Sequence, residues 1–193
     1  MGLVDKLRTR PAEAAKVLAV AAFGAAFAWL GTPSNISIAV GIPLIAVGLL
    51  IRSWAAGHLR RNQQLATSGP YAYLRDPLYL GRLFLLVGLG VLANNLYTYA
   101  LFGFAMIVFF LNYMPRKLAK ETKRLEHYFG QQYVEYRKEV RSLIPRLSPY
   151  PKRSTLGWSF ATFWRENREQ WLVFAVVLIV AVMVLRYTQL LRF

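Results

Sequence analysis

The chain has 193 residues, of which 56% are hydrophobic and 15% aromatic, and its formal net charge is +15. It contains no cysteine, which excludes disulfides and thiolate metal sites, and its two histidines are too few for a histidine metal cluster. The apolar residues come in long blocks separated by charged clusters, which indicates an all-α integral membrane protein and not a nucleic-acid-binding one.

Five apolar blocks are close to the ~20 residues that a helix needs to cross a bilayer. We expect about five transmembrane helices in a single membrane domain, over residues 12–30, 36–54, 77–93, 96–114 and 171–190. Pro115 is expected to stop the fourth span. The connectors after the first and third spans are only a few residues long, so the first four spans should form two antiparallel pairs. The ends of the third and fourth spans, near Asp76 and Pro115, should then lie side by side.

The basic residues are distributed unevenly between the two sides of the membrane. Residues 1–16 hold four Lys or Arg, residues 52–82 hold five, and residues 115–170 hold thirteen, whereas the short connectors around residues 32–35 and 94–95 hold none. Basic loops favour the cytoplasmic side and an anionic leaflet. This pattern predicts a cytoplasmic N-terminus, cytoplasmic segments 57–76 and 115–150, and an external C-terminus.

Residues 115–150 have the pattern of two amphipathic helices. Apolar residues recur at helical spacing up to Phe129, and Gly130 is a natural stop because glycine tolerates a left-handed backbone. A second short helix fits residues 131–141, with Tyr133 and Tyr136 on one face. These helices could lie on the membrane surface. Because the third and fourth spans end side by side, we expect them instead to fold over residues 58–76.

The most polar stretch between two apolar blocks is residues 68–81, Ser-Gly-Pro-Tyr-Ala-Tyr-Leu-Arg-Asp-Pro-Leu-Tyr-Leu-Gly. Gly69-Pro70 and Asp76-Pro77 are turn signals. Three tyrosines and the neighbouring pair of Arg75 and Asp76 supply binding groups. Such groups beside lipid predict a site at the membrane face.

Two blocks of the sequence resemble the signature of a known family. The first resembles G-P-Y-x-x-x-R-H-P-x-Y-x-G, and reads Gly69-Pro70-Tyr71-x-Tyr73-x-Arg75-Asp76-Pro77-x-Tyr79-x-Gly81. The second reads Glu121-Thr122-x-x-Leu125-x-x-x-Phe129-Gly130-x-x-Tyr133-x-x-Tyr136, with Pro145 following. Together they are similar to the isoprenylcysteine carboxyl methyltransferase and phospholipid methyltransferase superfamily of integral-membrane enzymes. The resemblance covers about residues 57–147.

This resemblance implies S-adenosylmethionine as cofactor and methyl transfer to a lipophilic acceptor at the cytoplasmic membrane face. It assigns cofactor binding to Tyr71, Tyr73, Arg75, Asp76, Pro77, Tyr79, Gly81 and Glu121. Arg75 suits the carboxylate of the cofactor, and Glu121 and Asp76 suit its ammonium. No catalytic residue is evident, although His58 is a candidate proton acceptor, and no metal is implied.

The chain departs from the family pattern at two positions. Asp76 stands where the signature has histidine, and Thr122 stands where it has a second glutamate. An aspartate followed by proline also favours a helix start, with the aspartate as N-cap. Asp76 is therefore either a ligand of the cofactor or a cap of the third span.

The acceptor is open at this stage. A prenylcysteine-like carboxylate, a lipid amine or a small thiol would each fit, as would a lipid-linked molecule. Two other functions remain: an NADPH-dependent membrane reductase of related fold, and a non-catalytic lipid-binding membrane protein. The short connectors favour a prokaryotic inner membrane.

Overall fold

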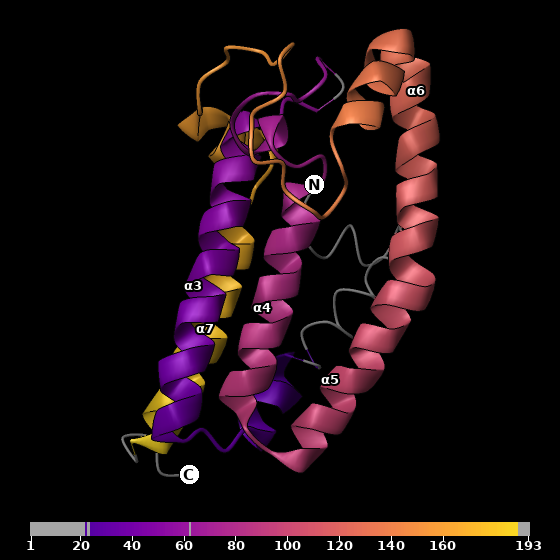
Figure 1. The fold of residues 1–193 in the computed structure, drawn as a ribbon. Helices are drawn as coiled ribbons and strands as arrows, with labels where there is room; N and C mark the ends of the chain where they lie inside the picture. Colours follow the sequence, from indigo (N-terminus) through magenta and orange to yellow (C-terminus); the bar gives the residue numbers. More distant parts are fainter. Residues whose placement is uncertain (1–21, 23, 62, 189–193) are drawn as a thin grey trace, which may run out of the picture.

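The structure is a computed structural model that describes residues 22, 24–61 and 63–188. In these residues it is helical and contains no strand. A helical stretch ends at Leu30, and the elements that follow are α3 (Asn35–His58), η1 (Gly69–Ala72), α4 (Pro77–Ala93), α5 (Leu96–Val108), η2 (Phe109–Tyr113), α6 (Met114–Glu139), η3 (Thr162–Glu166) and α7 (Gln170–Tyr187). Figure 1 shows α3, α4 and α7 running in roughly the same direction, with α7 behind α3, the α5–α6 rod leaning away from α4, and the long connectors gathered at one end.

The all-α membrane architecture is confirmed. Among the described residues, three helices are long and apolar enough to cross a membrane, Asn35–His58, Leu96–Glu139 and Gln170–Tyr187, and α4 is a shorter apolar helix. The second, third and fifth predicted spans therefore correspond to α3, α4 and α7. Residues 12–21, 23 and 189–190 of the first and fifth predicted spans lie outside the described residues. The number of five spans stays a prediction.

Helices α3 and α4 pack closely through four glycines in antiparallel register. A Cβ on Gly48 would lie 2.8 Å from the carbonyl oxygen of Gly81, and a Cβ on Gly88 would lie 3.0 Å from that of Gly41. Small residues let helix backbones approach closely where lipid supplies no hydrophobic force between helices. The most extensive contact of α4 is accordingly with α3 and not with α5. Helices α4 and α5, the predicted third and fourth spans, also contact each other, but less extensively.

Pro115 does not end the helix of the predicted fourth span. The chain passes from α5 through one turn of π-helix at Phe109–Tyr113 into α6, and the N–H of Met114 donates to the carbonyl of Phe109, five residues back. Proline cannot donate the hydrogen bond of an α-helix interior, and a π-turn is one way to rearrange the ladder around it. The prediction of a stop at Pro115 was wrong, because this rearrangement lets the helix continue.

Gly130 breaks α6 as the sequence predicts. Its backbone angles of φ 49° and ψ −131° are not helical, and the chain beyond it turns back. Tyr133, Tyr136 and Val140 then pack with Leu65 and Tyr150 in a small buried cluster. The end of α6 thus reaches the loop between α3 and α4.

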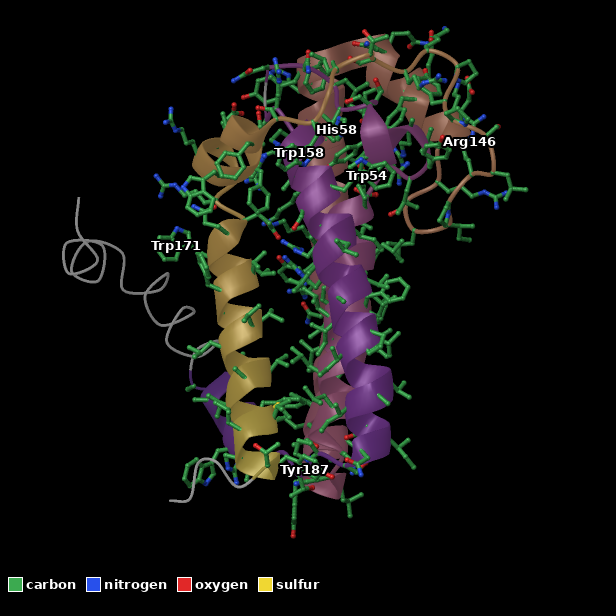
Figure 2. The ribbon with its side chains drawn as sticks, turned by 90° about the vertical axis from the view of Figure 1, so that its left-hand side faces the viewer. Trp54, His58, Arg146, Trp158, Trp171 and Tyr187 are labelled. Atoms are coloured by element: carbon green, nitrogen blue, oxygen red, sulfur yellow. The ribbon has the colours of Figure 1, made fainter. Side chains whose placement is uncertain are left out.

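Residues 154–169, called the strap below, cross the end of α3 and bind its last carbonyl groups. The Trp158 indole donates to the carbonyl of Ser53 at 3.0 Å, and the Asn167 amide donates to the carbonyls of Ala56 and Leu59 at 2.8 Å each. Figure 2 shows Trp158 beside His58 at this end of the bundle. The last carbonyls of a helix have no partner within the helix, so a distant segment satisfies them here.

Candidate functional site

A cavity of about 510 Å³ opens where the ends of α3 and α4 meet η1 and α6. This volume falls in the range of about 300–1,000 Å³ that is usual for small-molecule sites. Six of the residues predicted from the sequence line it: Tyr71, Arg75, Asp76, Pro77, Tyr79 and Glu121. The cavity therefore brings the two sequence blocks together.

The stretch carrying the first block is held by backbone hydrogen bonds to residues 141–150. The N–H groups of Arg75 and Asp76 donate to the carbonyls of Arg141 and Ser142, at 2.9 and 3.1 Å. In the other direction, the N–H of Tyr150 donates to the carbonyl of Ala72 at 2.8 Å. These bonds fix an otherwise irregular segment, so its side chains hold defined positions beside the cavity.

Tyr71 carries a buried hydroxyl without a partner. The residue is 6% exposed, its backbone carbonyl accepts a 2.7 Å bond from the Tyr136 hydroxyl, and its own hydroxyl bonds to no described residue. Burial raises the pKa of Tyr71, so the hydroxyl stays protonated and remains a donor at neutral pH. An unsatisfied buried polar group costs about 1–3 kcal/mol, which marks this hydroxyl as a candidate ligand contact.

Asp76 occupies the position before α4, but its side chain makes no cap bond. Its Oδ2 accepts a 2.6 Å hydrogen bond from the Ser142 hydroxyl and a 3.3 Å contact from Nε of Arg75. The capping role considered from the sequence is therefore not the one its side chain performs. The contact with Asp76 uses Nε of Arg75 and not its Nη1 or Nη2 groups.

Asp76→Asn should be at least as stable as the wild type at pH 7. Burial raises the pKa of Asp76, and the Ser142 hydroxyl and Arg75 oppose this only in part. Because the pKa of Asp76 is higher in the folded than in the unfolded protein, protonation favours the folded state. This contribution to the unfolding free energy is fully present below about pH 3.9, the unfolded pKa, and is lost as the pH rises through the folded pKa. Melting temperatures of both proteins between pH 4 and 8 should therefore diverge in favour of the variant as the pH rises. A variant less stable at pH 7 than at pH 4, relative to wild type, would contradict this sign.

Glu121 on α6 reaches the first block across the cavity. Its Oε2 accepts a 3.4 Å hydrogen bond from the Tyr79 hydroxyl, and Nη2 of Arg124 lies 3.6 Å from its Oε1. Tyr79 also packs with Phe109 and Met114, so the start of α4 and the start of α6 are in contact. The expectation that these two ends lie side by side is confirmed.

Arg52 is a buried cavity residue that the sequence analysis did not single out. It is 5% exposed, and its Nε and Nη2 both lie 2.5 Å from Oε1 of Glu169, at the start of α7. Its Nη1 donates to the carbonyl of Leu78 at 3.0 Å. The pair joins α3, α4 and α7. An arginine six residues before the end of an apolar helix is a signal for a buried partner, because unpaired charges at membrane depth are costly.

The described lining of the cavity is strongly basic. It holds eight cations and two carboxylates, with only Asp76 and Glu121 acidic; the cations are Arg52, Arg60, Arg61, Arg75, Arg82, Lys117, Lys120 and Arg124. The guanidinium of Arg82 lies over the ring of Tyr79, 5.7 Å from its centroid. A cavity with this balance favours ligands that carry negatively charged groups.

Three residues predicted from the sequence lie outside the lining. Tyr73 is 37% exposed at the end of η1, and Gly81 faces α3, where a Cβ would meet Cγ of Arg52 at 2.5 Å. His58 is buried, and its Nδ1 lies 3.0 Å from the Ser68 hydroxyl. These positions give Gly81 a packing role and leave His58 away from the cavity.

The chemistry available is binding and positioning. The cavity offers carboxylates, guanidinium groups and phenols, together with apolar surface from Leu65, Leu125 and Phe129. Among the described residues no group of three or more histidines, cysteines and carboxylates could hold a metal ion.

Comparison with known proteins places this cavity in a family context. The family described as phospholipid methyltransferase matches residues 36–132. The chain is 30% identical over 140 residues to the cobalt-zinc-cadmium resistance protein CzcN of Cupriavidus metallidurans, covering 71% of this chain and 62% of that protein. It is also 28% identical to the protein-S-isoprenylcysteine O-methyltransferase of Xenopus laevis, over 61% of this chain and 41% of that enzyme.

A plant relative gives a similar match. The chain is 32% identical to protein-S-isoprenylcysteine O-methyltransferase B of Arabidopsis thaliana, over 54% of this chain and 57% of that enzyme. The chain thus spans about 40–60% of the length of these methyltransferases. No solved structure matches.

Proposed function

Because the chain belongs to the phospholipid methyltransferase family, we propose that it transfers a methyl group from S-adenosylmethionine to a lipophilic acceptor. The observation that carries the proposal is the cavity in which both signature blocks meet, shown by the 3.4 Å contact between Tyr79 and Glu121. Relatives named as isoprenylcysteine O-methyltransferases support the same reaction class.

The residues around the cavity fit this cofactor. A carboxylate suits its ammonium, and Glu121 and Asp76 are the two acids in the lining. The rings of Tyr71 and Tyr79 suit a sulfonium through cation–π attraction. Leu65 and Phe129 supply apolar surface for an adenine. The cavity is also large enough for a molecule of this class.

The reaction asks this chain mainly for positioning. S-adenosylmethionine supplies an electrophilic methyl group when bound. The backbone bonds that hold residues 72–76 against residues 141–150 keep the binding groups in place, and fixed geometry can supply several kcal/mol of the barrier. The end of α6 packs on Leu65 and so forms one wall of the cavity. A carboxylate or thiolate acceptor would need no general base, which suits a cavity with no evident one.

We also propose that the site faces the cytoplasm and that the acceptor reaches it from the bilayer. The basic connectors gather at the end of the bundle where the cavity opens (Figure 1), and basic loops are typically cytoplasmic. The acceptor classes that fit are a prenylcysteine-like carboxylate, a lipid amine and a small thiol.

Glu121→Ala should weaken binding of S-adenosylhomocysteine by about 1.5–3 kcal/mol, the value of a hydrogen bond to a charged group. Calorimetry on the detergent-purified protein measures this directly. The matched control is Glu126→Ala on the same helix, since Glu126 is absent from the cavity lining and pairs with Arg137 at 2.9 Å. Equal affinities of wild type and Glu121→Ala would remove Glu121 from the site, and no binding to the wild type would contradict the proposed function.

A further inference from the structure

The inner end of the cavity is built from charged and polar groups at the depth of the apolar helices. Arg52 lies six residues before the end of α3, and Arg82 lies five residues after the start of α4. Both line the cavity, and their charges act on each other. Glu169 pairs with Arg52 alone among these two, so a further anion in the cavity would be attracted by both guanidinium groups.

Arg52 has donors to spare. A guanidinium has five N–H groups, and the contacts to Glu169 and to the carbonyl of Leu78 occupy one on each of its three nitrogens. Two N–H groups remain without a partner among the described residues, on a side chain that lines the cavity.

The Tyr71 hydroxyl is a second donor without a partner at this place. It is buried, it bonds to no described residue, and it belongs to a residue that lines the same cavity as Arg52. A buried donor that no described residue satisfies is a candidate contact for a ligand. The group that accepts from a phenol and from a guanidinium together is an anionic oxygen.

We propose that Arg52 and Tyr71 form a binding subsite for a carboxylate or phosphate group, and that Glu169 is a positioning residue that fixes the Arg52 guanidinium for it. The proposal rests on the proposed function and deepens it. The acid group belongs either to the amino-acid part of the methyl donor or to the head of the acceptor. Glu169 lies outside residues 36–132, the segment that matches the family.

Tyr71→Phe is the sharpest test because it removes only the unpartnered hydroxyl. The melting temperature should stay equal or rise, since no internal hydrogen bond is lost. If the subsite binds the carboxylate of the methyl donor, the affinity of Tyr71→Phe for S-adenosylhomocysteine should be about tenfold lower than that of the wild type. The affinity for 5′-methylthioadenosine, which lacks the carboxylate, should not change. Tyr128→Phe, an exposed tyrosine on α6, is the matched control and should leave both affinities unchanged.

If the subsite instead binds an acidic group of the methyl acceptor, Tyr71→Phe should bind both nucleosides as the wild type does and should bind an acidic amphiphile more weakly. Dodecyl phosphate serves as the probe and dodecyltrimethylammonium as its control of opposite charge, with binding read as a thermal shift in dodecyl maltoside. Wild type should be stabilised by the phosphate alone, and Tyr71→Phe should lose most of that stabilisation. Either pattern supports the subsite.

Glu169→Gln tests the positioning role. It keeps an acceptor for Arg52 but removes the charge, so the acid ligand should bind several-fold more weakly while 5′-methylthioadenosine binds as before. The control is Glu166→Gln, an exposed glutamate in the strap. If Glu169 had a purely structural role, Glu169→Gln would weaken binding of the acid ligand and of 5′-methylthioadenosine equally, and the positioning role would be wrong.

The proposed subsite is wrong if Tyr71→Phe changes neither the affinity for S-adenosylhomocysteine nor the stabilisation by dodecyl phosphate. It is also wrong if Tyr71→Phe lowers the melting temperature, because that would reveal a partner of the hydroxyl within the protein. Arg52→Lys is the second variant, because it keeps the positive charge and loses the planar guanidinium with its several N–H donors. Unchanged affinity for the acid ligand would show that Arg52 is not part of the subsite. Failure of the wild type to bind S-adenosylhomocysteine contradicts the proposed function instead, and the dodecyl phosphate measurement still decides the subsite.

Discussion

Replacing Glu169 by alanine is expected to cost about 3–5 kcal/mol of unfolding free energy, because it leaves the Arg52 charge buried and unpaired. Both side chains are largely buried, at 6% and 8% exposure, and Arg52 makes two contacts of 2.5 Å with the same carboxylate oxygen. Arg52 has no second acid to turn to, since the other described group that it contacts is the carbonyl of Leu78. Unfolding in mixtures of dodecyl maltoside and dodecyl sulfate gives the free energy.

The matched control is Glu166→Ala, three residues away in the strap. Glu166 is exposed and accepts a 3.3 Å bond from the Thr162 hydroxyl, so its loss should stay within about 0.5 kcal/mol, as for most surface changes. If the Glu169 and Glu166 variants unfold at the same denaturant concentration, the buried pair does not hold α7 to α3.

Gly48→Ala should destabilise the protein by about 2–3 kcal/mol, a large effect for one added methyl group. The new Cβ would lie 2.8 Å from the carbonyl oxygen of Gly81 and 2.9 Å from the backbone nitrogen of Leu85. Overpacking of a close contact costs about 1–3 kcal/mol, and backbone atoms on the facing helix cannot rotate away as a side chain does.

Gly103→Ala is the same substitution in open space. Gly103 lies in α5, and no atom would lie within 4 Å of its Cβ. Since alanine is a better helix former than glycine by about 0.8–1.0 kcal/mol, this variant should be neutral or slightly more stable. Equal melting temperatures for the two variants would show that α3 and α4 do not meet through Gly48.

The helices were predictable because their ends carry clear signals. Asp76-Pro77 begins α4 and Asn94 ends it in a left-handed conformation with φ 49°, as the predicted boundaries of 77–93 require. Gly130 breaks α6 for the same reason. Pro115 misled the prediction because the π-turn before it compensates for the missing N–H. That compensation leaves no mark in the local sequence.

The site was predictable in part. The signature blocks placed Tyr71, Asp76 and Glu121 at one cavity, but they could not separate ligand contacts from packing. The short helix η1 turns Tyr71 inward and leaves Tyr73 at its exposed end. Asp76 meets Ser142, which lies 66 residues along the chain. Contacts of that separation depend on the tertiary fold and not on local pattern.

The pairing of Arg52 with Glu169 has a consequence for biogenesis. The two residues are 117 positions apart, so the ribosome makes the arginine long before its counter-ion. Until the strap and α7 follow, α3 enters the membrane with an uncompensated charge and with its last carbonyls uncapped. The inner wall of the cavity is therefore completed only when α7 inserts, and Arg52 gains its counter-ion only in a chain translated to that point.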